Sequence, residues 1–138
     1  MLKAHSHEVT AVACNNGTMV STGRDDQLSL FSYDQGEYQF LRQIALEQFS
    51  MASSLDILDG RILVGHDNGK VQTVNVDGTN RELVHAAHYD GETWGLQIVP
   101  EAGTFLTCGD DNLIYEFSIK DKKLVRQAKL WTLDANNG

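Results

Sequence analysis

The sequence predicts an all-β fold of about three four-stranded blades, arranged as an open arc of a larger β-propeller. Acidic or amide turn residues recur at intervals of 43 residues: Asp25, Asn68 and Asp111. The same interval separates three strand-ending apolar residues: Phe31, Val74 and Phe117. A repeat of about 40–45 residues that carries four short strands is the pattern of a propeller blade.

The repeats place three blades along the chain, and the boundaries are at about 5–46, 47–86 and 87–130, with a tail at 131–138. Val9–Phe31 aligns without gaps with Ala52–Val74, whereas the third copy needs two extra residues before Gly103. A propeller closes with about four to eight blades. We therefore expect a piece of a longer protein, whose remaining blades would complete the ring.

In the first blade, turn residues bound each predicted strand. Asn15-Asn16-Gly17 is typical of a two-residue hairpin because Asn and Gly accept positive φ. Beyond the turn Gly23-Arg24-Asp25-Asp26, Leu28 and Leu30 alternate with polar residues, as in a half-buried strand. The predicted strands are Val9–Cys14, Thr18–Thr22, Gln27–Phe31 and, after a loop at Tyr33–Glu37, the polar outer strand Tyr38–Leu46.

The second and third blades repeat this plan. Asp59-Gly60 and Asp77-Gly78 predict hairpin turns in the second blade. Pro100 ends the first strand of the third blade because proline offers no N–H to a strand ladder. The predicted strands are Ala52–Leu58, Ile62–Gly65, Val71–Val76 and one around Arg81–Ala86, then Thr93–Val99, Phe105–Cys108, Leu113–Ile119 and Leu124–Leu130.

The composition is that of a globular protein, with 41% hydrophobic and 22% charged residues among 138. No apolar run is long enough to span a membrane, and the first residues lack the apolar core of a signal peptide. We expect a soluble, cytoplasmic protein without a membrane partner. Cys14 and Cys108 lie among apolar neighbours, which predicts buried free thiols.

The net charge of −8 argues against nucleic-acid binding, which needs a basic face. The charge is uneven, however: residues 1–119 contain 17 acidic and six basic residues, and residues 120–138 contain two acidic and five basic residues. The basic strip consists of Lys120, Lys122, Lys123, Arg126 and Lys129. It could meet an acidic partner, or it could simply be a solvated outer strand.

No motif in the sequence indicates catalysis. The paired carboxylates Asp25-Asp26 and Asp110-Asp111 could suggest acid–base or metal chemistry, but each pair lies in a repeated turn. The histidines and cysteines lack the tight spacing of zinc ligands. Phosphate-binding loops and nucleophile elbows are absent from the sequence. The sequence therefore predicts a non-enzyme with no catalytic residue, metal or cofactor.

The blade pattern resembles that of WD-repeat β-propellers. In that family, a histidine before the first strand and an aspartate in the turn before the third strand join a hydrogen-bonded network within each blade. The resemblance carries this role to the following positions: His5, His88, Asp25, Asn68 and Asp111.

The chain departs from the family pattern in three ways. Alanine precedes His5 and His88 where the family prefers glycine. The blades end in dipeptides other than Trp-Asp: Phe31-Ser32, Val74-Asn75 and Phe117-Ser118. The second blade has no histidine near Gln48-Phe49-Ser50, which puts its network in doubt.

Three segments are similar to consecutive blades of echinoderm microtubule-associated protein-like proteins: LKAHSHEVTAV, ILVGHDNGKV and HYDGETWGLQIVP. The segment from Glu92 to Leu96 is the most specific, because ordinary WD repeats rarely place Trp-Gly-Leu on the first strand. The resemblance implies a protein-interaction scaffold that binds tubulin or microtubules. It also implies a place in the cytoplasm and cytoskeleton, including the cilium or axoneme.

Trp94 has two interpretations, an exposed anchor for a partner or packing between adjacent blades. The sequence favours packing, because Gly95 permits close approach and Leu96 alternates beside it. Tubulin's surface is acidic, so the basic strip is the candidate contact. Two other functions stay open: a generic WD-repeat adaptor for ubiquitin ligation or signalling, and a purely structural component of a ciliary assembly.

Overall fold

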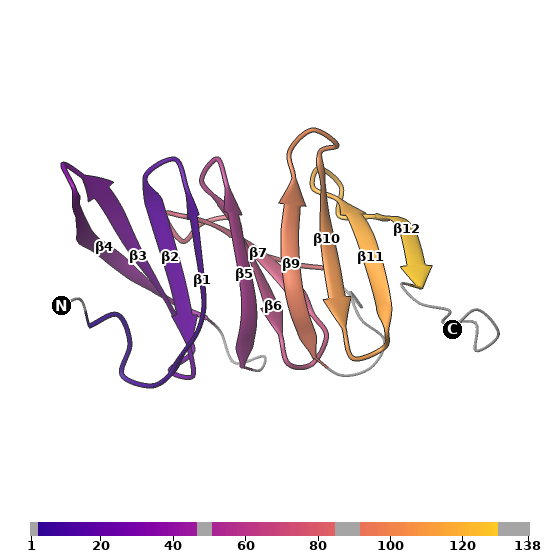
Figure 1. Ribbon diagram of the computed structural model, residues 1–138, viewed down its shortest axis with the longest axis horizontal. Coiled ribbons are helices and arrows are strands. Elements are labelled where there is room, and N and C mark those ends of the chain that lie inside the picture. The colour runs from indigo at the N-terminus through magenta and orange to yellow at the C-terminus, as the bar shows by residue number, and fades with distance from the viewer. Residues whose placement is uncertain (1–2, 47–50, 85–91, 130–138) are drawn as a thin grey trace, which may run out of the picture.

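Three four-stranded antiparallel sheets make up the computed structural model, which describes residues 3–46, 51–84 and 92–129. Each sheet is formed by four strands that are consecutive in the sequence (Figure 1). Within these described ranges there is no helix, and hence none that could cross a membrane. The predicted all-β fold of about three propeller blades in an open arc is confirmed.

The strands follow the predicted order. Blade 1 contains β1 (Val9–Asn15), β2 (Thr18–Gly23), β3 (Gln27–Asp34) and β4 (Glu37–Ala45). Blade 2 contains β5 (Ala52–Leu58), β6 (Arg61–His66), β7 (Val71–Asn75) and β8 (Glu82–Val84). Blade 3 contains β9 (Thr93–Val99), β10 (Thr104–Gly109), β11 (Leu113–Ser118) and β12 (Leu124–Lys129).

The first hairpins form as the turn residues predict. Asn16 and Gly17 have φ of 45° and 74°, which is the left-handed region that the Asn-Gly turn requires. The loop expected at Tyr33–Glu37 is wrong, because β3 and β4 continue to a two-residue turn at Gln35-Gly36. Tyr33 pairs with Tyr38 across the two strands, and their ring centroids are 5.0 Å apart. This aromatic pair stabilises the extended hairpin.

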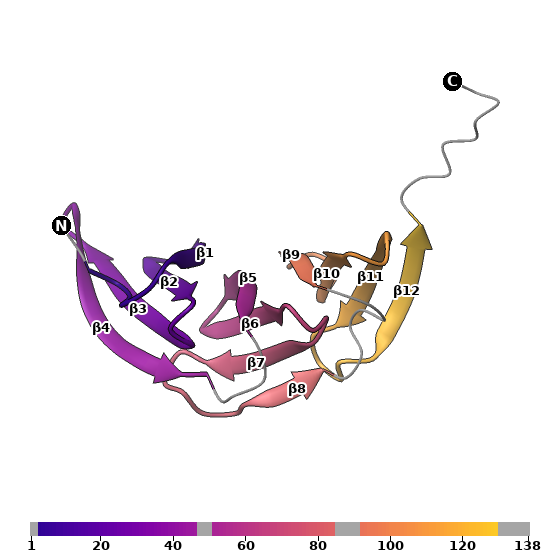
Figure 2. The same cartoon turned by 90° about the horizontal axis from the view of Figure 1, so that it is seen from below.

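The blades pack side by side in a curved row, with β1, β5 and β9 on the concave side (Figure 2). One buried apolar cluster lies between blades 1 and 2, and a second lies between blades 2 and 3. In the second cluster, Phe105 stacks on Phe117 with ring centroids 5.3 Å apart. Each blade therefore has a forward face, toward the following blade, and a rear face, toward the preceding one.

The two cysteines are free, but the prediction that both are buried is wrong for Cys14, which is exposed. Cys14 lies on the rear face of blade 1. The residues at its position in the other blades, Ile57 and Ile98, pack against a preceding blade and are 4% and 5% exposed. Cys108 is partly exposed on the forward face of blade 3.

Hydroxyl groups on the first strands connect neighbouring blades. Thr10 Oγ1 donates a hydrogen bond to the carbonyl oxygen of Ala52, 2.8 Å away. Ser53 occupies the same position in blade 2 and donates to the carbonyl oxygen of Thr93, 2.7 Å away. Each bond joins a first strand to the start of the next first strand, and so fixes the spacing of the blades.

Candidate functional site

A buried polar network surrounds His5, just before β1. Its Nδ1 lies 2.9 Å from Asp25 Oδ1, and its Nε2 lies 2.8 Å from Ser21 Oγ. The backbone N–H of Ser6 also donates to Asp25 Oδ2, at 2.9 Å. His5 is only 8% exposed, so its ring fixes the segment before β1 against the turn between β2 and β3. The structure thus brings together His5 and Asp25.

Gly23 leaves room for this imidazole. A Cβ at Gly23 would lie 3.3 Å from the His5 ring and 2.6 Å from the carbonyl oxygen of Glu8. Glu8 also accepts a hydrogen bond from the N–H of Arg24 there, at 2.9 Å. Any other side chain would force the incoming segment away from the turn.

The three recurring turn residues share a local role. Asn68 Oδ1 accepts a hydrogen bond from the N–H of Lys70, and Asp111 Oδ1 accepts one from the N–H of Leu113, both at 3.1 Å. Asp25 accepts from the N–H of Gln27, again two residues on. A carboxylate and an amide both make this turn, so Asn can replace Asp in blade 2.

Blade 2 places a histidine in a different part of its sheet. His66 ends β6 at the position of Gly23, and it is fully buried. Its Nε2 lies 2.9 Å from the side-chain nitrogen of Gln72. Gln72 stands where blade 1 has Ser29, which donates to the carbonyl oxygen of Ala4 at 2.6 Å. Blade 2 thus carries its buried imidazole at the end of the second strand itself, whereas blade 1 has Gly23 there and places the His5 ring beside it.

Blade 3 has a third arrangement at these positions. His88 lies outside the described residues. Thr107 and Tyr115 stand where blade 1 has Ser21 and Ser29. Burial, the negative charge of Asp111 and a hydrogen bond to that carboxylate raise the pKa of the Tyr115 hydroxyl. The Asp111 carboxylate therefore interacts with Tyr115 on β11 as well as with the backbone of its own turn.

The network around Asp25 makes the stability of the chain depend on pH. Burial opposes ionisation, but hydrogen bonds from Ser6 and His5 and the attraction of His5 lower the pKa of Asp25. A lowered pKa stabilises the folded state above the ordinary value of about 3.9. That contribution is lost as the pH falls through the lowered value. We expect Asp25→Asn to be less stable than the wild type at pH 6, and this difference to shrink below about pH 4.

Urea unfolding at pH 6 and at pH 3 would measure this difference. Asn68 already stands at the same position in blade 2, so the turn itself accepts an amide. Asp26→Asn is the matched control and should show the same small difference at both pH values. A gap between Asp25→Asn and the wild type that stays constant with pH would contradict the role of the Asp25 charge.

Trp94 does not pack between the described blades. It is 59% exposed, and its indole N–H donates a hydrogen bond to the Asp110 carboxylate. The interpretation that favoured packing between adjacent blades therefore stays a prediction, which the three described blades do not test. Trp94 stands at the position of Thr10 and Ser53, where the other blades carry the hydroxyl that reaches the next blade.

Carboxylates lie close together near Trp94, around the turns before the third strands of blades 2 and 3. Burial, together with the charges of Asp67 and Asp110, raises the pKa of Glu92, and the charge of Arg24 opposes the rise. The N–H of Glu92 donates to Asp110 Oδ2 at 2.9 Å. The side of the blades that carries the turns before the third strands therefore has a negative potential.

The basic strip lies on blade 3, and most of it belongs to the turn between β11 and β12, at the other end of β11 from the turn that contains Asp110 (Figure 1). Lys122 forms an ion pair with Glu82 of blade 2, and Arg126 forms one with Glu116. Lys120 and Lys123 are exposed. Lys129 ends β12. Of the four strip residues whose side chains are described, two therefore pair with carboxylates and two are exposed lysines.

Sequence reasoning missed the contacts of Thr10, Ser53 and His66. A signal for the first two was present, because these hydroxyl residues keep the 43-residue interval of the repeat. His66 gave no such signal, since its counterparts in the other blades are glycines.

The described residues contain no group of three or more histidine, cysteine or acidic side chains that could hold a metal ion. Asp25 and Asp111 are both engaged in the turns described above. These groups stabilise the blades, while Trp94, Lys120 and Lys123 are among the exposed residues that a partner could contact.

Comparison with known proteins agrees with this arrangement. No protein-family model matches the chain. The ciliary WD repeat-containing protein ctxp80 of Euplotoides octocarinatus is 30% identical over 129 residues, which is 94% of this chain and 17% of that protein. The chain thus spans less than a fifth of this relative's length.

Two computationally designed proteins have similar crystal structures. Ika4 superposes with a TM-score of 0.74 at 21% identity, over 93% of this chain and 76% of its own. Ika8 superposes with a TM-score of 0.72 at 23% identity, over 91% of this chain and 37% of its own. At these identities the likeness shows the fold alone.

Proposed function

We propose that this chain, which consists of three blades of a WD-repeat β-propeller, is a non-enzymatic interaction segment that binds tubulin or microtubules. The proposal places it in a cytoskeletal or ciliary protein of the echinoderm microtubule-associated protein-like kind. Two observations support it: the similarity to a ciliary WD-repeat protein and the segment from Glu92 to Leu96.

The observation that carries the binding surface is the exposure of Lys120 and Lys123 on an otherwise acidic chain. Both lysines lie in the turn between β11 and β12, at the other end of β11 from the acidic turn that contains Asp110. An acidic protein surface such as that of tubulin would be attracted to this turn and repelled by the acidic turns before the third strands. The charges therefore fix the orientation in which the arc binds.

Lys122 and Arg126 have a structural role in this account. Lys122 joins blade 3 to Glu82 of blade 2, and only 20% of its side chain is exposed. Arg126 pairs with Glu116, whose side chain is 8% exposed. The pairing with Arg126 and a hydrogen bond from Thr104 lower the pKa of Glu116, which keeps this carboxylate charged. Reversing Lys122 or Arg126 would disturb the blade as well as any partner contact.

The double variant Lys120→Glu/Lys123→Glu is expected to bind microtubules about three- to tenfold more weakly in co-sedimentation at low salt. Two attractive surface contacts would become repulsive, and each is worth about 0.2–1 kcal/mol. Wild-type binding should itself weaken as the salt concentration rises, because salt screens exposed charges.

Lys3→Glu/Lys70→Glu is the matched control, since it makes the same charge change outside the turn between β11 and β12. It should co-sediment like the wild type. Equal binding by the two double variants would remove the basic strip from the proposal. Enrichment of other proteins without tubulin in a pull-down would instead favour a WD-repeat adaptor.

A further inference from the structure

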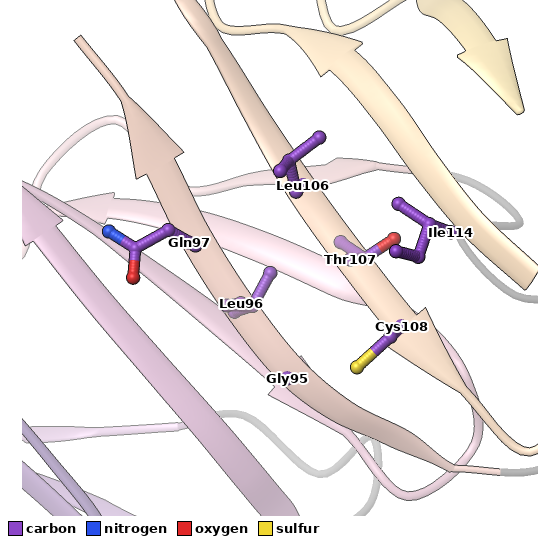
Figure 3. Close-up of a pocket in the computed structure, with 7 residues that line it drawn as sticks. All are labelled: Gly95, Leu96, Gln97, Leu106, Thr107, Cys108 and Ile114. Atoms are coloured by element: carbon purple, nitrogen blue, oxygen red, sulfur yellow. The ribbon is translucent and has the colours of Figure 1, made fainter. Parts of the chain in front are cut away.

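The junction between blades 2 and 3 differs in kind from the forward face of blade 3. That forward face carries an apolar hollow lined by residues of β9, β10 and β11, among them Leu106 and Ile114 (Figure 3). The equivalent residues of blade 1, Val20 and Leu28, are fully buried against blade 2, so the hollow is of the kind that packs against another blade. The junction with blade 2 adds a charged contact to such packing, through Lys122.

Lys122 lies at a backbone position that favours glycine. Its φ is 58°, in the left-handed region that residues with a Cβ rarely adopt. Blade 2 has Gly78 at the equivalent place in its own turn, with a φ of 85°. In both turns the preceding aspartate accepts the N–H of the residue that follows, at 2.9 Å in blade 2 and 3.1 Å in blade 3. Blade 3 therefore carries a lysine where the backbone alone favours glycine.

The side chain of Lys122 reaches across to blade 2. Its ammonium group pairs with the Glu82 carboxylate on β8, and only 20% of the side chain is exposed. Arg61 of β6 donates to the same carboxylate oxygen, at 3.1 Å. The hydrogen bond from Lys122, and the charges of Lys122 and Arg61, lower the pKa of Glu82 against the opposing effect of burial. Glu82 therefore stays charged and holds the lysine.

The backbone of Lys122 belongs to a closed turn between β11 and β12, the basic turn, which also carries Lys120 and Lys123. The N–H of Lys122 donates to the carbonyl oxygen of Ser118, and the N–H of Ser118 donates to that of Lys123, both at 2.9 Å. A turn closed by its own hydrogen bonds moves as a unit. Holding Lys122 therefore also fixes the direction in which the two exposed lysines point.

We propose that Glu82 on blade 2 is a positioning residue for the basic turn on blade 3. Through Lys122 it holds the turn in the orientation in which Lys120 and Lys123 meet an acidic partner. The inference rests on the proposed function, because it concerns the same turn. Charge alone would give Glu82 the opposite effect: its carboxylate repels an acidic partner and neutralises Lys122, so its loss would strengthen binding. The sign of the change therefore separates positioning from simple attraction.

Glu82→Gln removes the charge and keeps the size of the side chain. We expect microtubule co-sedimentation at low salt to weaken about two- to fivefold, which is the loss of a surface ion pair expressed as a change in affinity. Glu101→Gln is the matched control, because it removes an exposed carboxylate from the turn between β9 and β10. That turn lies beside the basic turn, since the carbonyl oxygen of Gly103 accepts the N–H of Ile119 at 3.1 Å. Glu101→Gln should bind as tightly as the wild type or more tightly.

Two further measurements test whether Glu82 acts through Lys122. Lys122→Met keeps the aliphatic stem, and its loss of binding should not add to that of Glu82→Gln in the double variant, because both break the same pair. In the free protein, amide exchange at Lys122 and Lys123 should become faster in Glu82→Gln, since the turn loses its attachment to blade 2. Thermal melting of this variant should change little.

The outcomes separate this inference from the proposed function. If the wild type binds microtubules and Glu82→Gln binds equally well or better, the inference is overturned and the proposed function stands. Additive losses in the double variant, or unchanged amide exchange in the basic turn, would also overturn the inference. A wild-type chain that does not bind microtubules would overturn the proposed function and the inference together.

Discussion

Phe105→Ala is expected to lower the free energy of unfolding by about 3–5 kcal/mol. Phe105 is fully buried and stacks on Phe117 with an interplanar angle of 19°. It belongs to the cluster that joins blade 3 to Leu63 and Val71 of blade 2. Removing the ring leaves a cavity at the junction, and a small domain has only about 5–15 kcal/mol of stability in total. Urea unfolding followed by circular dichroism would measure the loss.

Phe40→Ala is the matched control. Phe40 is 54% exposed on the outer strand of blade 1, although it contacts Phe31 edge to face at 5.7 Å. We expect its loss to cost less than about 1 kcal/mol, the value of one exposed aromatic contact. Equal losses for the two variants would show that the packing between blades 2 and 3 does not hold the arc together.

His5→Ala is the substitution with the second-largest expected effect. It removes the imidazole that contacts both Asp25 and Ser21, and it opens space above Gly23. A buried polar group left without its partner costs about 1–3 kcal/mol, and here two such groups are affected. Thermal melting should show the destabilisation, and the exchange of amide protons in β1 should become faster.

His7→Ala provides the comparison. His7 is exposed and its Nδ1 lies 2.9 Å from Ser6 Oγ, outside the buried network. A surface substitution of this kind is expected to change stability by less than about 0.5 kcal/mol. If His7→Ala and His5→Ala melted alike, the network would not be a source of stability for blade 1.

Local chemistry made the strands and hairpins predictable from the sequence. Asn16-Gly17 and Asp59-Gly60 have the positive φ that their turns need, and this requirement is visible in the residue types alone. The 43-residue interval followed from the side chains of Asp25 and its counterparts, each of which accepts a backbone N–H two residues on. The turn at Gln35-Gly36 was missed because the pairing of Tyr33 with Tyr38 depends on strand register.

Burial between blades could not be predicted from alternation. An alternating strand shows that one face is apolar, but not whether a neighbouring blade covers it. Cys14 and Val12 are exposed for this reason, whereas their counterparts in blade 2 are buried. The same limit applied to Trp94, whose neighbours Gly95 and Leu96 suggested packing while the indole itself reaches the Asp110 carboxylate.

The charge strip illustrates a related limit. The excess of lysine and arginine after residue 119 was visible in the sequence. Which of these residues pair with carboxylates depends on the positions of Glu82 and Glu116, which lie on other strands. Among the strip residues whose side chains the structure describes, Lys120 and Lys123 are exposed without an ion pair to these two carboxylates, and the proposed function rests on them.

Zero-length crosslinking of this chain to microtubules, followed by mass spectrometry, tests the proposed function most directly. A carbodiimide joins a lysine amine to a carboxylate only when the two are in contact. We predict that Lys120 and Lys123 form crosslinks to acidic residues of tubulin, and that high salt suppresses them. Crosslinks at Lys3 and Lys70 in place of this pair, or none at any lysine, would contradict the account.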